Sequence, residues 1–169
     1  VGVASSGEVL VTGAGGNLNI FAEGAGEGPS IRRGPFVARY NPADGVVVRV
    51  HGIDCFFTAA GKAVLGTDDG GSIVAGDYRD YMIFERYTPD EQTMNATSFW
   101  DLFLARFDDQ EELVWARSMV DWAGMDTEPA GSERLWGAAH GAGGTTLLTG
   151  TFDGTLYLDF APLVASLDG

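Results

Sequence analysis

Phe103-Leu104-Ala105-Arg106-Phe107 is the second copy of a pattern that first occurs as Phe36-Val37-Ala38-Arg39-Tyr40. Side chains of an extended chain alternate between two faces, so each copy places two aromatic residues and an alanine on one face. The aliphatic residue and the arginine between them point to the other face. We therefore expect two strands that occupy equivalent places in repeated structural units.

A second element occurs three times and ends each time in glycine: Leu10-Val11-Thr12-Gly13, Ile73-Val74-Ala75-Gly76 and Leu147-Leu148-Thr149-Gly150. A short apolar run and a glycine-containing turn precede every copy, which is typical of a tight hairpin. Each copy of the first pattern is followed by a polar turn and a further apolar run. The two apolar runs are aligned so that Val48 matches Trp115. One unit is thus predicted to hold four antiparallel strands. They fall near residues 1–4, 9–12, 36–40 and 46–50, then 63–66, 72–78, 103–107 and 113–117, and finally 136–140 and 145–152.

A four-stranded antiparallel meander repeated along a chain is the blade of a β-propeller. We predict an all-β fold of this type, with blades at about residues 1–51 and 62–118 and a partial blade at about 135–169. A closed propeller needs at least about four blades, so we expect an incomplete propeller or part of a larger one. The remaining blades would come from a longer chain, which we favour, or from self-association into a ring. An open stack of sheets is the third alternative.

The units resemble the repeats of the bacterial β-propeller repeat proteins, which are exported and multi-bladed. The matching segments are Val11-Thr12-Gly13, Leu148-Thr149-Gly150, Asp101-Leu102-Phe103-Leu104-Ala105-Arg106-Phe107-Asp108 and Val114-Trp115-Ala116-Arg117-Ser118. The resemblance covers most of the chain, and its motifs are structural. It implies a propeller fold in an exported bacterial protein.

The charge balance narrows the choice of partner. The chain has 24 acidic and 10 basic residues and a net charge of −14, which repels nucleic-acid phosphates and anionic lipid surfaces. It has no apolar run of about 20 residues, so we expect no membrane insertion. Its single cysteine, Cys55, permits no internal disulfide. An acidic surface suits an extracytoplasmic protein, secreted or at the cell surface.

The long connections are expected at one end of the units, where loop variation is tolerated and binding residues concentrate. In an up-and-down meander these are residues 22–35, 52–61, 88–100 and 119–133, whereas the turns at the opposite end are short. Aromatic rings beside charges suit stacking on sugars or holding a protein loop, although the same rings also serve as plugs beneath loops. Phe99 and Glu133 lie on these connections. The predicted ligand-binding residues there are Arg32, Arg33, Phe56, Phe57, Trp100, Asp121, Trp122, Asp126 and Glu128.

Other motifs give weaker signals. Residues 9–18 are similar to a dinucleotide-binding fingerprint, but the glycine-rich segment that follows is unsuited to the helix this motif needs. The acidic turns at 68–71, 108–112 and 153–154 offer oxygen ligands without the spacing of a calcium loop, so we predict no cofactor and keep calcium as an alternative. His51 and His140 lack partners at ligand spacing, and we predict no metal site.

The sequence favours a non-enzymatic binding or scaffold module that uses the long-connection face to bind a protein or a glycan. We predict no catalytic residues, because no nucleophile motif occurs. One alternative is a hydrolase or lyase acting on polysaccharide with carboxylates on the same face, such as Asp121 and Asp126. Another is a structural repeat segment in a ring or fibre, since an incomplete propeller must cover its sheet edges.

Overall fold

A computed structural model describes residues 1–19, 30–97, 99–121, 133–142, 145–151, 155–158 and 161–164. Side chains are described for residues 1–15, 34–97, 99–119, 133–142 and 145–151. The described residues form strands β1 to β15 and no α-helix, so this part of the chain has no helix that would cross a membrane. The chain is therefore all-β, as predicted.

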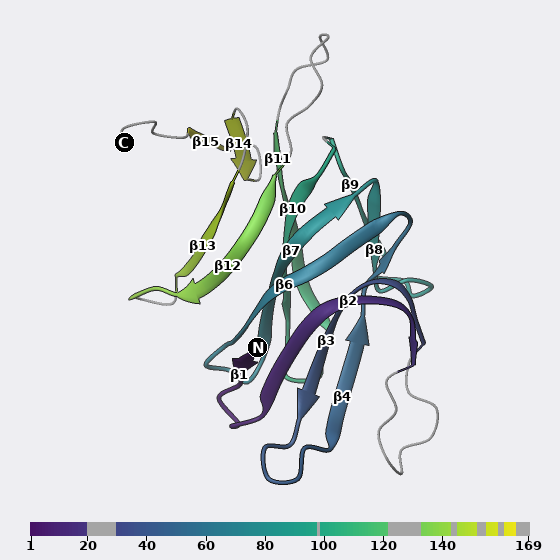
Figure 1. The fold of residues 1–169 in the computed structure, drawn as a ribbon, viewed down its shortest axis with the longest axis vertical. Coiled ribbons are helices and arrows are strands. Elements are labelled where there is room, and N and C mark those ends of the chain that lie inside the picture. Colours follow the sequence, from purple (N-terminus) through teal and green to yellow (C-terminus); the bar gives the residue numbers. More distant parts are fainter. Residues whose placement is uncertain are drawn as a thin grey trace.

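Three antiparallel sheets follow one another along the chain and stack face to face (Figure 1). Sheet one contains β1 (Gly2–Val3), β2 (Val9–Asn19), β3 (Ser30–Tyr40) and β4 (Val47–Gly52), in that order. The core of sheet two contains β6 (Thr58–Gly66), β7 (Ser72–Arg79), β10 (Asp101–Phe107) and β11 (Leu113–Asp121). Sheet three contains β12 (Arg134–His140) and β13 (Thr146–Thr151). These strands lie close to the strand positions predicted from the sequence.

Strands outside this pattern are additions to it. A small sheet is formed by β5 (Asp54–Cys55), β8 (Tyr81–Phe84) and β9 (Gln92–Asn95), of which β8 and β9 are inserted between the second and third strands of sheet two. The strands β14 (Thr155–Leu158) and β15 (Ala161–Val164) extend sheet two beyond β11. The connection predicted over residues 88–100 therefore contains a strand, and β3 already begins inside the connection predicted over 22–35.

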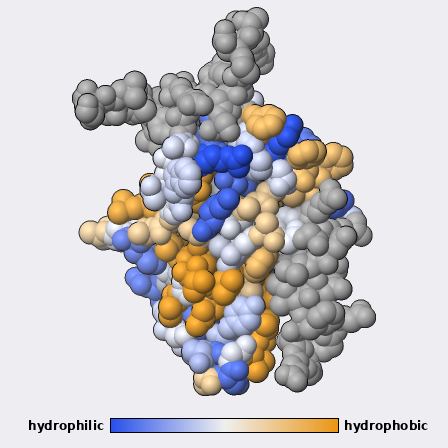
Figure 2. Space-filling view, in the orientation of Figure 1, coloured by the Kyte–Doolittle hydropathy of each residue, from blue (hydrophilic) through white to orange (hydrophobic). Residues whose placement is uncertain are grey.

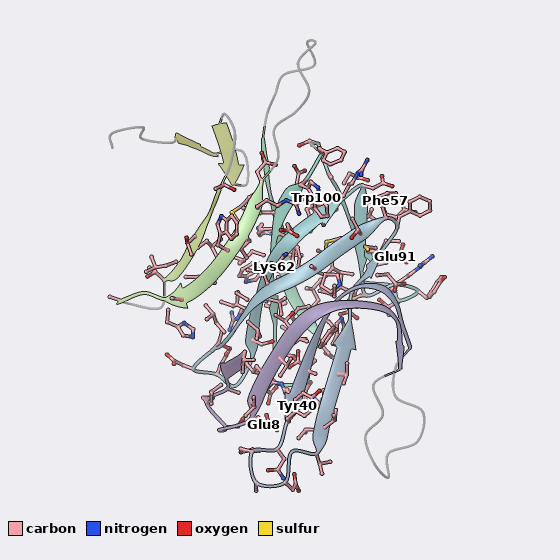
Figure 3. All side chains as sticks on the ribbon, in the orientation of Figure 1. Glu8, Tyr40, Phe57, Lys62, Glu91 and Trp100 are labelled. Carbon is pink, nitrogen blue, oxygen red and sulfur yellow. The ribbon has the colours of Figure 1, made fainter. Side chains whose placement is uncertain are left out.

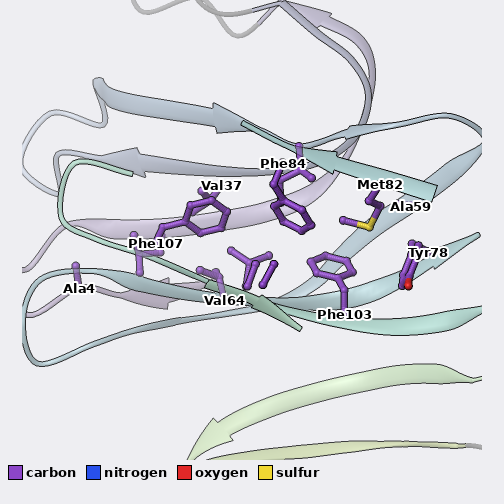
Figure 4. Packing of buried hydrophobic residues seen from close by; sticks show 14 residues of the cluster. Ala4, Val37, Ala59, Val64, Tyr78, Met82, Phe84, Phe103 and Phe107 are labelled. Atoms are coloured by element: carbon purple, nitrogen blue, oxygen red, sulfur yellow. The ribbon is translucent and has the colours of Figure 1, made fainter. Parts of the chain in front are cut away.

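The largest core lies between sheets one and two (Figure 4). Phe103, Ala105 and Phe107 of β10 point toward sheet one and are fully buried, as the alternating pattern predicted. Sheet one meets them with Leu10 and Val37, which are also fully buried. Burial of such side chains stabilises the fold by roughly 1.5–3 kcal/mol each. We call the face of each sheet that points toward the next sheet its front face, and the other its back face.

A smaller core lies between sheets two and three. It is formed by Ala75, Leu102, Met119 and Leu135, with Leu148 packed against it. In sheet two, Val74 and Phe103 lie on the back face, and their neighbours Ala75 and Leu102 lie on the front face. Both faces of sheet two are therefore covered, which the alternation of side chains in each strand makes possible.

An arginine and a glutamate join sheets one and two at the short-turn end. Arg39 is 2 % exposed, and its Nε donates a hydrogen bond to the carboxylate of Glu111, which is 3 % exposed. Glu8 Oε2 lies 3.3 Å from Arg39 Nη1, and Ser72 Oγ lies 3.4 Å from the second carboxylate oxygen of Glu111. The side chain of Arg39 thus points away from the aromatic residues of its strand, as predicted.

The two strand pairs beyond these turns have the same register and the same bulge, but their positions along the sequence differ by one residue. Arg39 is paired with Arg49 in sheet one, whereas Arg106 is paired with Trp115 in sheet two. The sequence alignment that matched Val48 with Trp115 was therefore wrong by one residue. The turn before β11 is one residue shorter than the turn before β4, so Arg49 is the structural counterpart of Trp115.

Candidate functional site

The side chains at the long-connection end carry exposed aromatic rings around one arginine. Arg79 ends β7, and its Cζ atom lies 4.5 Å from the ring centroid of Phe57 and 3.9 Å from that of Phe99. Each phenyl ring is 52 % exposed. A guanidinium held between two aromatic faces gains cation–π energy on both sides while its N–H edge stays available. Arg79 forms no ion pair with any other described residue.

A second aromatic pair extends this surface. Phe56 is 63 % exposed and stacks on Tyr81, with ring centroids 5.1 Å apart and an interplanar angle of 17°. The backbone also holds the pair together, because Phe56 N donates to Tyr81 O at 3.1 Å. We define the rim surface as Phe56, Phe57, Arg79, Tyr81 and Phe99. Exposed rings that gather in this way are more typical of a contact surface than single exposed apolar residues are.

Trp100 lies next to this surface but is held differently. Figure 3 shows Trp100 and Phe57 toward the same end of the molecule. The Cζ atom of Arg134 lies 3.8 Å from the Trp100 ring centroid, and Glu133 N donates to Trp100 O at 3.0 Å. Trp100 therefore joins sheets two and three, and its ring is only partly exposed.

Arg134 also takes part in a charge cluster around one buried carboxylate on the front face of sheet two. Asp77 is 1 % exposed, and its Oδ2 atom lies 3.7 Å from Arg134 Nη1 and 3.9 Å from Lys62 Nζ. Burial raises the pKa of Asp77, and the two cations offset part of that rise. The cluster lies between two sheets, so we interpret it as part of their interface.

A small cavity of about 280 Å³ lies at the end of β4. Its lining includes His51, whose Nε2 atom lies 3.7 Å from Glu85 Oε1, and Asp54, whose Oδ2 atom accepts a hydrogen bond from Arg86 at 2.9 Å. Burial lowers the pKa of His51, against the opposing effect of the Glu85 carboxylate. Among the described residues, no three His, Cys, Asp or Glu side chains form a group suited to a metal ion.

The structure brings together only some of the residues predicted from the sequence. Phe56 and Phe57 lie in the rim surface, and Trp100 lies beside it. Arg32 and Arg33 lie in β3, and Asp121 ends β11, but their side chains are outside the described set. Trp122, Asp126 and Glu128 lie outside the described residues.

Sequence reasoning missed Arg79 and Tyr81, which organise the rim surface. Arg79 ends β7 and Tyr81 begins β8, at the end of the sheet where the long connections lie. Their position at this end of a predicted strand is the signal that could have identified them. Their aromatic partners come from two other segments of the chain, so their contacts are visible only in three dimensions.

Comparisons with known proteins add no assignment to this geometry. No family model matches the chain, and neither a curated protein nor a solved structure matches it.

Proposed function

We propose that the chain is a non-enzymatic binding module and that the rim surface is its binding site. The observation that carries this proposal is the exposed arrangement of Phe57, Arg79 and Phe99, with rings 4.5 and 3.9 Å from one guanidinium carbon. Rings of this kind supply a large contact area at low conformational-entropy cost. The guanidinium edge adds hydrogen-bond donors for a carbonyl or carboxylate oxygen of the ligand.

The stacked sheets act as a scaffold of the β-propeller type in this proposal. Support comes from three consecutive antiparallel sheets. The second sheet packs on the first through one face and on the third through the other. Binding sites on such scaffolds are built on loops that a rigid frame positions. The partner is a protein or a glycan, and the acidic composition, with a net charge of −14, fits an extracytoplasmic location in a bacterium.

The test compares binding by the wild type with binding by the double variant Phe57→Ala/Phe99→Ala. Immobilised protein is presented with a panel of oligosaccharides and with a secreted-protein fraction, and bound material is quantified. We expect the double variant to lose most of the binding, because aromatic anchors dominate such contacts. Tyr87→Ala is the matched control, since Tyr87 is 77 % exposed and lies outside the rim surface. Equal binding by wild type and double variant would contradict the proposal.

A further inference from the structure

The interface between sheets one and two pairs the front face of one unit with the back face of the next. Leu10 and Val37 on the front face of sheet one are 0 % exposed, and so are Val74, Phe103 and Phe107 on the back face of sheet two. These positions are equivalent in the two sheets, because the segments of β2 and β7 that lead up to Gly13 and Gly76 align, as do the two strands with the aromatic-alanine pattern. The equivalent positions can therefore be identified on the back face of sheet one and on the front face of sheet three, which no described sheet covers.

The back face of sheet one carries these positions, and none of the sheets in the described part of the chain packs on them. Val11 is the counterpart of Val74, and Phe36 and Tyr40 are the counterparts of Phe103 and Phe107. The strand pairing of Val11 with Ala38 places them all on one face. Their counterparts are fully buried, whereas Val11, Phe36 and Tyr40 are each only partly buried. Figure 2 shows hydrophobic residues gathered around β1 and β2 on the side viewed.

The front face of sheet three presents the complementary positions. Leu147 is the counterpart of Leu10, and it is 58 % exposed where Leu10 is 0 % exposed. Its neighbour Leu148 points to the opposite side and packs against sheet two. Trp136, which is 71 % exposed, lies at the bulge in β12, as Lys62 does on the front face of sheet two. One chain thus carries both halves of the apolar contact that joins its own sheets.

We infer that two copies of this chain associate head to tail, with the back face of sheet one in one copy packed on the front face of sheet three in the other. The two surfaces differ, so the contact is heterologous and extends to a closed ring or to an open filament. The inference does not depend on the rim surface, which lies at the end of the sheets and not on their faces.

Two matched variants test this contact by sedimentation velocity over a range of protein concentrations. Val11→Lys places a charge on the back face, and Leu147→Lys places the same charge on the front face. We expect wild-type protein to form species larger than one chain in a concentration-dependent way. Each variant alone should associate roughly tenfold more weakly or worse, because every contact in that sample buries one lysine.

Mixing the two variants gives the sharpest result. One intact back face and one intact front face remain in the mixture, so we expect 1:1 dimers and no larger species. The Val48→Lys variant is the control on the same sheet, at the bulge in β4. Val48 is 51 % exposed and its counterpart Val114 remains 49 % exposed although sheet one covers sheet two, so this substitution should leave association unchanged.

Circular dichroism is used to check that each variant is folded. Tyr40→Lys replaces Val11→Lys, and Trp136→Lys replaces Leu147→Lys, if either of the first pair fails this check. The inference is overturned if wild-type protein remains a single chain at every concentration, if either folded variant associates as the wild type does, or if the mixture forms no dimer. The Phe57→Ala/Phe99→Ala variant should associate as the wild type does, which separates this test from that of the rim surface.

Discussion

The interface between sheets one and two and the interface between sheets two and three use equivalent strand positions in different ways. The first contains fully buried aromatic rings and the buried pair Arg39–Glu111. The second contains smaller apolar side chains and a cavity of about 420 Å³, where Arg106, the counterpart of Arg39, pairs with the exposed Asp69. The backbone frame is thus compatible with a tightly packed contact between sheets and with a looser one.

The largest difference should appear when the two arginines are replaced. Arg39→Leu leaves Glu111 buried without its cation, which we expect to lower the free energy of unfolding by about 3–5 kcal/mol. Arg106→Leu removes a partly exposed pair with Asp69 and should cost less than about 1 kcal/mol. Urea unfolding of both variants measures the difference. Equal losses would show that the first pair is not buried in solution.

Two glycines provide a smaller contrast of the same kind. A Cβ atom on Gly66 would lie 2.2 Å from Val3 O and 2.7 Å from Ala4 Cα, so Gly66→Ala should push sheets one and two apart and cost roughly 1–3 kcal/mol. A Cβ atom on Gly137 in β12 would meet only Thr149 Cγ2, at 3.7 Å. Gly137→Ala should therefore be neutral or raise stability by up to about 1 kcal/mol. Thermal unfolding distinguishes these outcomes, and similar melting temperatures for the two variants would contradict the close approach at Gly66.

The strand framework was largely predictable from the sequence, because period-two alternation and the short apolar runs that lead up to a glycine are local signals. The inserted hairpin of β8 and β9 was not, although Met82 and Phe84 of β8 are fully buried in the main core. Its turns place Asp80, Glu85 and Tyr87 at positive φ angles of 75°, 50° and 69°. Glycine usually marks such turns, so residues with side chains at these positions leave no recognisable turn signal.

The candidate site was predictable only in part, for a different reason. Phe56 and Phe57 were identified because they lie on a long connection, which is a property of the sequence. Arg79 was not, because what distinguishes it is its contact with Phe57 and Phe99, from two separate connections. Residues brought together by the stacking of strands carry no common local pattern.

Asp77 offers a pH-dependent test of the looser interface. Burial raises the pKa of Asp77 in the folded protein above its value in the unfolded chain, so the folded state holds the proton more tightly. The resulting stability is present below the ordinary aspartate pKa and is lost as the pH rises through the raised one. Between about pH 4 and pH 7 the free energy of unfolding should therefore fall less for Asp77→Asn than for the wild type. The other titrating groups are common to both proteins and cancel in this comparison. A larger loss in the variant would mean that Lys62 and Arg134 outweigh burial.

The smallest effect on stability is expected at the rim surface. Phe99→Ala removes a ring that is 52 % exposed and should change the free energy of unfolding by about 0.5 kcal/mol or less. Chemical denaturation provides the measurement. A loss comparable to that of Arg39→Leu would place Phe99 in the core and remove it from the binding surface.

The central claim is that the back face of sheet two packs on sheet one and its front face on sheet three. Nuclear Overhauser contacts between specifically labelled side chains test this most directly. The rings of Phe107 and His51 have centroids 4.9 Å apart, and Leu102 shares the smaller core with Leu135. We predict cross-peaks for Phe107 with His51 and for Leu102 with Leu135. Cross-peaks between Phe107 and Leu135 in place of these would contradict the account.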